Sequence, residues 1–247
     1  MFLFDGTLIN YKYSYIGEDK KCILFLHGYG ADSKSFDYYF NRLKNDYNIV
    51  TIDFPPFGLS SKLHNPWSVE DYAKMVYFLL KFLNITKTNI ISHSFGGRVA
   101  ILLATRYNVC EKLVLISSAG LKPKFNIIKK FKVFIYKVKK YFKLDVSKYG
   151  SSDYNSLDDL TKISFNKIIH YYQNNMCKKL KNQTLIIWGK NDKETPLYMA
   201  KKFKKYIKNS KLIVYDSDHY VHIYKKDLAL KNIKTFLGDV NDVLFSK

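Results

Sequence analysis

Short runs of apolar residues recur along the chain, and each is followed by a segment that contains glycine or charged side chains. The runs are mostly continuous and do not alternate with polar residues; they lie at 22–26, 48–52, 89–91, 112–117, 184–188 and 211–215. Continuous apolar runs of this length predict strands that are buried on both faces of a sheet.

Between these runs, apolar residues recur at helical spacing. The predicted helices cover 35–43, 68–83, 98–106, 197–207 and 225–237. Alternation of strand and helix predicts an α/β fold, in which helices cover both faces of a mostly parallel sheet.

Two segments depart from that rhythm. Residues 2–16 alternate around Asp5-Gly6, which predicts a hairpin and an antiparallel edge of the sheet. Residues 121–182 contain no strand-like run, and their spacing predicts amphipathic helices over 125–142 and 157–176. We therefore divide the chain into a core of 1–120 and 183–247 and an inserted unit of 121–182.

The motif Ser92-His93-Ser94-Phe95-Gly96-Gly97 connects a predicted strand to a predicted helix. A serine on a tight turn between strand and helix forms a nucleophile elbow, which needs small residues on either side. The turn exposes the Ser94 hydroxyl above the sheet. It also points the Phe95 N–H, at the start of the helix, toward an oxygen bound beside the serine.

Four other strands also end in segments rich in polar residues or glycine, at 27–30, 53–60, 188–192 and 216–219. The carboxyl ends of parallel strands are where open α/β sheets hold their sites. Asp192 and His219 lie in two of these segments, and both are expected near Ser94.

Together these motifs resemble the α/β-hydrolase family over nearly the whole chain, and Ser94, Asp192 and His219 follow the family's triad order. Ser92, Pro56 and Asp218 stand where the family usually has glycine. The resemblance implies an α/β-hydrolase fold with 121–182 as a helical cap, or lid, over the serine. It also implies an oxyanion hole formed by the backbone N–H groups of Tyr29 and Phe95.

In the predicted mechanism Ser94 is the nucleophile, His219 is the base that activates it, and Asp192 orients the imidazole. His222 is the rival candidate for the base, but His219 occupies the position that matches the family motif. A serine nucleophile argues against the dehalogenase and epoxide-hydrolase branches of the family, which attack through a carboxylate.

The formal net charge of +20 suggests nucleic-acid binding, but only Arg42, Arg98 and Arg106 among the 41 basic residues are arginines. Nucleic-acid surfaces usually exploit the planar fork of arginine, so we expect no nucleic-acid function. Cys22, Cys110 and Cys177 are few and far apart, which predicts neither a disulfide framework nor a metal site. No cofactor is expected.

No apolar run approaches the ~18 residues of a membrane span, and no signal peptide is recognisable, so we expect a cytoplasmic protein. The lysines of 125–142 suggest contact with an anionic membrane, but a cap that keeps its lysines in water is the favoured interpretation. The sequence predicts neither the oligomeric state nor the residues that bind the substrate.

The leading hypothesis is a serine hydrolase of carboxylesterase type, which cleaves a small or medium apolar substrate through an acyl-enzyme. C–C bond hydrolysis and a peptidase activity like that of proline iminopeptidase are alternatives on the same scaffold. A non-catalytic protein that binds a small ligand is the alternative from a different functional class.

Overall fold

The computed structural model describes residues 1–124 and 157–238. A seven-stranded sheet has the order β3-β5-β4-β6-β7-β8-β9. Only β3 is antiparallel to its neighbour, and the other strand pairs are parallel. The strands of this sheet are β3 (Tyr11–Ser14), β4 (Cys22–Leu26), β5 (Asn48–Ile52), β6 (Thr88–His93), β7 (Cys110–Ile116), β8 (Thr184–Gly189) and β9 (Ser210–Tyr215). The predicted mostly parallel sheet is confirmed.

Helices cover both faces of the sheet because successive residues of each buried strand point to opposite sides. In β4, Leu24 and Leu26 pack with the helices of one face, and Ile23 and Phe25 pack with those of the other. The first face carries α2 (Val69–Phe82), α3 (Phe95–Leu102) with the π-helical turn η2 (Leu103–Tyr107), α7 (Asn174–Lys179) and α8 (Leu197–Tyr206). The second carries the 3₁₀ turn η1 (Ser33–Phe36), α1 (Asp37–Leu43), α9 (Val221–Tyr224) and α10 (Lys226–Leu237).

The predicted N-terminal edge is correct only in part. β3 forms the antiparallel edge, but β1 (Phe2–Phe4) and β2 (Thr7–Ile9) form a separate two-stranded sheet around the Asp5-Gly6 turn. Aromatic contacts explain the separation: the ring of Phe4 packs on Trp67 and that of Phe2 packs on Phe82. The hairpin thus covers α2 rather than extending the main sheet.

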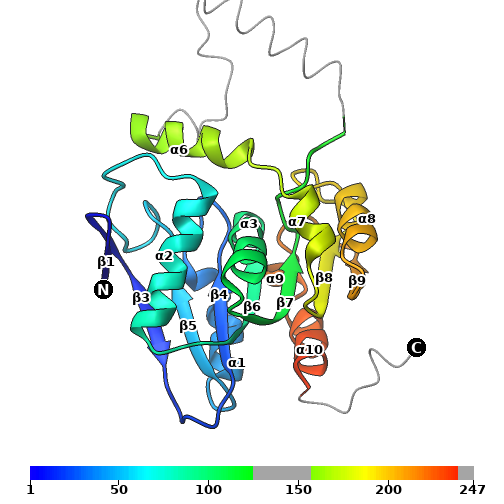
Figure 1. Ribbon diagram of the computed structural model, residues 1–247. Coiled ribbons are helices and arrows are strands. Elements are labelled where there is room, and N and C mark those ends of the chain that lie inside the picture. The colour runs from blue at the N-terminus through cyan, green and yellow to red at the C-terminus, as the bar shows by residue number, and fades with distance from the viewer. Residues whose placement is uncertain (125–156, 239–247) are drawn as a thin grey trace, which may run out of the picture.

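The predicted single helix over 157–176 is wrong. The chain forms α6 (Asp159–Ile169), turns at 170–173, and then forms α7. The turn is held by tertiary contacts, since the Gln173 backbone N–H donates to the Gly120 carbonyl at 2.8 Å, and local spacing does not reveal such contacts. Figure 1 shows α6 lying across the end of the sheet, above α2 and α3. The predicted helix over 125–142 lies outside the described residues.

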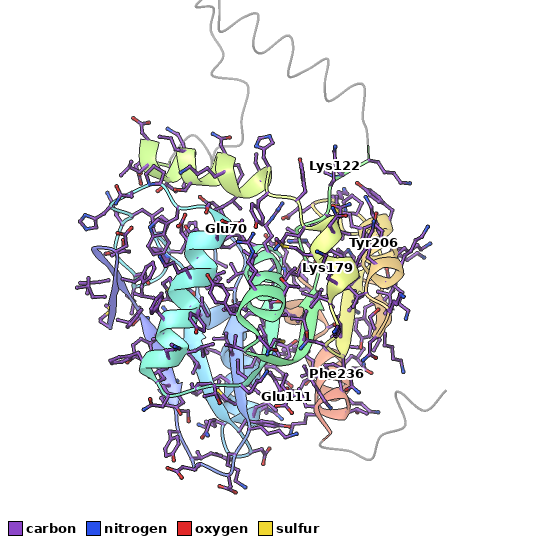
Figure 2. The ribbon with its side chains drawn as sticks, in the orientation of Figure 1. Glu70, Glu111, Lys122, Lys179, Tyr206 and Phe236 are labelled. Atoms are coloured by element: carbon purple, nitrogen blue, oxygen red, sulfur yellow. The ribbon has the colours of Figure 1, made fainter. Side chains whose placement is uncertain are left out.

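Side chains fill the space between helices and sheet (Figure 2). Glu70 lies in the first turn of α2 and is labelled below α6. It accepts a hydrogen bond from the Tyr171 hydroxyl at 2.7 Å and pairs with Arg106 at 2.7 Å. This network ties the chain just after α6 to the helices beneath it.

Within the described ranges, no helix has the length and apolar character needed to cross a membrane.

The start of α3 lies so close to β4 that only glycine fits there. A Cβ at Gly96 would lie 2.2 Å from the Leu26 carbonyl oxygen, which is main chain and cannot rotate away. At Gly97 the nearest obstacle is instead a side chain, because a Cβ there would lie 1.9 Å from Oγ of Ser118.

We therefore expect Gly96→Ala to lower the free energy of unfolding by about 2 kcal/mol or more, because the clash must move backbone. Urea unfolding followed by circular dichroism measures the change. Gly97→Ala is the matched control: Ser118→Gly should partly restore its stability but should not restore that of Gly96→Ala. A Gly96→Ala variant as stable as the wild type would contradict this packing.

Candidate active site

Ser94 connects β6 to α3 in a strained conformation that fits the predicted elbow. Its φ of 47° and ψ of −110° lie where residues other than glycine are rare. Three backbone hydrogen bonds hold the turn: the Ser94 N–H donates to Ile116, and the Ser94 carbonyl accepts from Gly97 and Ala119, at 3.0–3.1 Å. The strain is therefore compensated by the end of β7 and the loop that follows it.

Ser92 stands where the elbow usually has glycine, and the structure explains why it fits. Its side chain is fully buried, and its hydroxyl donates to the Val114 carbonyl of the neighbouring strand at 3.0 Å. A small side chain whose single polar group is satisfied costs little at a buried position.

Asp192 and His219 lie in the loops after β8 and β9 and meet at the carboxyl edge of the sheet. Nδ1 of His219 is 2.9 Å from Oδ2 of Asp192, and the two residues are only 4% and 5% exposed. Asp192 also accepts hydrogen bonds from the Glu194 and Thr195 N–H groups and from the Thr195 hydroxyl. The structure thus brings these two predicted residues into contact.

Burial acts to raise the pKa of Asp192, but His219 and Thr195 outweigh it, and the pKa lies below its ordinary value. The carboxylate is therefore ionised at neutral pH and can only accept hydrogen bonds. An ionised acceptor at Nδ1 keeps the proton of a neutral His219 on that atom, which leaves Nε2 as the basic position.

Glu194 is a neighbour of His219 that the sequence analysis missed. Its Oε2 lies 3.3 Å from Nε2 of His219, and its side chain is 58% exposed. Ser94 and Glu194 line one cavity, but the Ser94 hydroxyl makes no hydrogen bond to any described side chain. The only sign in the sequence that Glu194 belongs to the site is that it is a second carboxylate residue, two positions after Asp192 in the same loop.

The rival histidine, His222, lies behind the site. Its ring centroid is 4.1 Å from that of His93 and 5.3 Å from that of Phe36, and it does not contact Asp192. Burial, and then the charge of His219, lower the pKa of His222 to about 3. His222 is thus a neutral core residue at physiological pH, and the geometry favours His219 as the base.

Asp53 and Asp218 are two of the other aspartates near these loops, and both have structural partners. Asp53 accepts from the Ser33 and Leu59 N–H groups, so it orders the turn before Ser60. Asp218 is exposed and accepts from the Tyr220 N–H at 2.9 Å. Its carboxylate serves the turn in place of the usual glycine.

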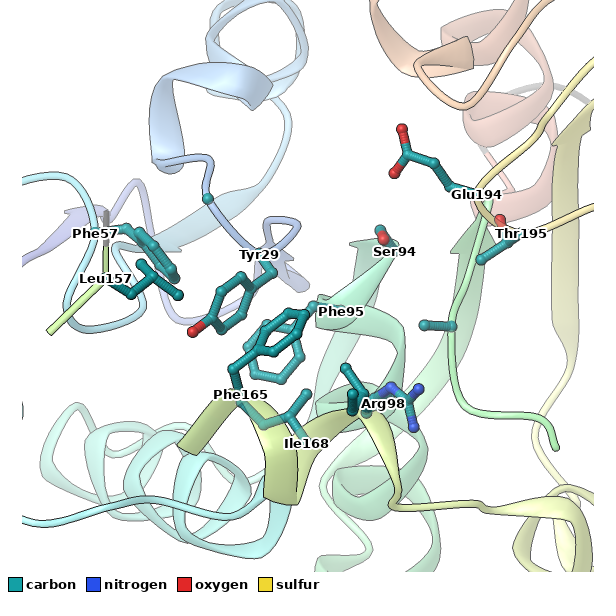
Figure 3. Close-up of a pocket in the computed structure, with 13 residues that line it drawn as sticks. Tyr29, Phe57, Ser94, Phe95, Arg98, Leu157, Phe165, Ile168, Glu194 and Thr195 are labelled. Atoms are coloured by element: carbon teal, nitrogen blue, oxygen red, sulfur yellow. The ribbon is translucent and has the colours of Figure 1, made fainter. Parts of the chain in front are cut away.

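Ser94 opens onto a cavity of about 440 Å³. Tyr29, Phe57 and Phe95 line it from the core, and Phe165 and Ile168 line it from α6 (Figure 3). The Tyr29 ring packs on Phe57, Phe95 and Phe165 at centroid distances of 4.7–5.7 Å. The space is mainly apolar, with Ser94, Glu194, Thr195 and Arg98 as its polar side chains besides the Tyr29 hydroxyl.

The oxyanion role of the Tyr29 and Phe95 N–H groups stays a prediction, although both residues border the cavity beside Ser94. The division into core and cap also stays a prediction, because 125–156 lie outside the described residues. Residues 1–124 and 157–238 contain no group of three or more His, Cys, Asp or Glu side chains that could hold a metal ion.

Comparison with known proteins identifies the family. The family model for the alpha/beta hydrolase fold matches residues 21–161, which is more than half of the chain. The uncharacterized hydrolase YugF of Bacillus subtilis is 24% identical, and the match covers 96% of each chain.

Two solved structures share the fold. A meta-cleavage product hydrolase from Pseudomonas fluorescens IP01 has a TM-score of 0.74 at 20% identity and covers 96% of each chain. The enol-lactonase from Burkholderia xenovorans LB400 has a TM-score of 0.74 at 18% identity and covers 94% of this chain and 97% of its own. At such identities the likeness extends to the fold alone.

The burial of His222 predicts a loss of stability in acid. The unfolded chain takes up a proton near pH 6.5, whereas folded His222 resists protonation until about pH 3, so lowering the pH through this window favours unfolding. Between pH 7 and pH 5 this one group should cost about 2 kcal/mol.

We expect His222→Phe to reduce that loss, as measured by urea unfolding at pH 7, 6 and 5. Tyr39→Phe is the matched control, since it removes the hydrogen bond from the Tyr39 hydroxyl to the His222 carbonyl but leaves the imidazole. It should lower stability equally at each pH. An unchanged acid dependence in His222→Phe would show that His222 is not the source.

Proposed function

The chain belongs to the alpha/beta hydrolase fold family, and we propose that it is a serine hydrolase that cleaves esters through an acyl-enzyme. The observation that carries the proposal is the buried 2.9 Å contact between His219 and the ionised Asp192. These two residues contact Glu194 and Thr195, which line the cavity onto which the strained Ser94 turn opens. A protein that only binds a ligand has no need of the contact between His219 and Asp192, which orients a base.

In the proposed reaction, Nε2 of His219 takes the proton of Ser94 as its oxygen attacks the carbonyl carbon of the ester. Asp192 stabilises the imidazolium that forms, and the Tyr29 and Phe95 N–H groups bind the oxyanion. His219 then protonates the leaving group and activates the water that releases the acid. Glu194 has to turn away from Nε2 before Ser94 can use it.

The cavity supports a small or medium apolar acyl group. A volume of about 440 Å³ with an aromatic wall accommodates a short acyl chain better than a bulky one. A panel of p-nitrophenyl esters of increasing acyl length, run beside an N-terminal proline peptide, separates the esterase from the peptidase alternative. C–C bond hydrolysis is tested with a vinylogous 1,5-diketone acid.

Replacement of the nucleophile gives the central test. Ser94→Ala should abolish labelling by a fluorophosphonate probe and lower kcat for p-nitrophenyl butyrate by roughly 10³-fold or more, because no other group supplies the attacking oxygen.

Ser92→Ala is the matched control, two residues earlier in the same motif, and it should still label and turn over. Labelling of Ser94→Ala at the wild-type rate, or a wild type that neither labels nor hydrolyses any ester, would rule out the proposal.

The exposed carboxylate of Glu194 can pair with Nε2 of His219 only while that nitrogen carries a proton, so the pairing should favour the form of His219 that cannot accept the proton of Ser94. An exposed ion pair is worth up to about 1 kcal/mol, so Glu194→Ala should raise the labelling rate about two- to fivefold. Lys193→Ala, at the neighbouring exposed position, is the control and should label like the wild type. A slower Glu194→Ala would mean that this carboxylate assists the reaction instead.

A further inference from the structure

Arg98 is a buried cation on the wall of the cavity that contains Ser94. Arg98 lies in α3, four residues after Ser94, which immediately precedes this helix, and both residues line the same cavity. Figure 3 shows Ser94 at the junction of strand and helix, with Arg98 further along the same helix beside Ile168. Arg98 is only 7% exposed.

The guanidinium of Arg98 has few partners for so buried a charge. Its Nη1 donates to the Tyr171 carbonyl, and no carboxylate of the described ranges forms an ion pair with it. By contrast, Arg106, which is about half exposed, pairs with Glu70 at 2.7 Å. Within the described ranges, most of the five N–H donors of the Arg98 guanidinium therefore have no acceptor.

Burial lowers the pKa of Arg98 to about 10, so the side chain is still cationic at neutral pH. A buried charge without a counter-ion is costly, and the cost is recovered when an anion binds. A cation of this kind in a substrate cavity is therefore prepared to bind an anionic ligand.

We propose that Arg98 binds a carboxylate on the acyl part of the substrate, so that the protein prefers half-esters of short dicarboxylic acids. The inference rests on the proposed ester hydrolysis at Ser94. A carboxylate matches the planar fork of arginine and can accept two hydrogen bonds from it. The aromatic wall packs against the methylene groups between the two ends of the acyl chain.

Glu194 favours one orientation of the bound substrate. It lines the cavity next to His219, whereas Arg98 lines the cavity from α3. A negative group is therefore repelled from the base and attracted to Arg98. A cavity of about 440 Å³ with both Ser94 and Arg98 on its wall has room for a short acyl chain between the carbonyl and the carboxylate.

Arg98 also has a structural contact that the experiment must separate from recognition. Its bond to the Tyr171 carbonyl and the bond from the Gln173 side chain to the Arg98 carbonyl, at 2.8 Å, fasten the connection between α6 and α7 to α3. A fastening role alone would affect every substrate equally, whereas recognition would affect only anionic ones.

The test compares mono-p-nitrophenyl adipate with its ω-methyl ester, in which a neutral methyl ester replaces the charged carboxylate. The measured quantity is the ratio of kcat/KM for the two esters. We expect wild type to prefer the carboxylate about tenfold or more, and Arg98→Met to lower the ratio about 10- to 100-fold. Arg98→Lys, which keeps the charge without the fork, should lie between them.

Tyr171→Phe is the matched control, because it removes the bond to Glu70 in the same connection but leaves the guanidinium in place. It should keep the wild-type ratio. An unchanged ratio in Arg98→Met, with both esters slowed alike, would leave Arg98 only its fastening role and overturn the inference.

The ratio of kcat/KM for the two esters in the wild type tests the inference even if Arg98→Met fails to fold. Hydrolysis of the neutral ester with no preference for the carboxylate would overturn the inference while the proposed function stands. Failure to hydrolyse either ester, together with no fluorophosphonate labelling of Ser94, would overturn both.

Discussion

The ionised carboxylate of Asp192 is held in a nearly dry environment by hydrogen bonds from Thr195 and His219, and the chemistry of the site depends on it. Without that acceptor, nothing fixes which nitrogen of His219 carries the proton. The loop that supplies the Thr195 hydroxyl also contains Asp192 and Glu194, so a few consecutive residues set the state of the base. Most of the remaining fold serves to bring this loop to Ser94.

The parallel sheet performs that task. Because β6, β8 and β9 run in the same direction, the loops after them open at one edge, where Ser94, Asp192 and His219 lie. Behind that edge, the buried ring of His93 links two of these loops, since its Nε2 lies 3.1 Å from the His219 carbonyl. Burial, followed by the charges of His222 and His219, keeps the pKa of His93 well below its ordinary value, so the ring stays neutral.

The sequence predicted the main sheet from its continuous apolar strands. It predicted the contact between Asp192 and His219 from the polar segments that follow those strands, together with the resemblance to the α/β-hydrolase family. It did not predict the separate β1-β2 sheet or the turn at 170–173, because both are decided by contacts with distant residues, Trp67 and Gly120 among them. Glu194 and Arg98 were missed as site residues for a related reason. A charged side chain in a loop or helix looks ordinary until the burial and the neighbours of its polar end are known.

Ser92 has a consequence for how such proteins are found. Its hydroxyl is satisfied by Val114, so the turn tolerates a side chain where sequence patterns usually demand glycine. The requirement at that position is a small volume with no unmet polar group, and several amino acids meet it. Sequence patterns that require glycine at this position therefore miss chains whose backbones form the same turn. A pattern that limits only the size of the side chain at this position would include them.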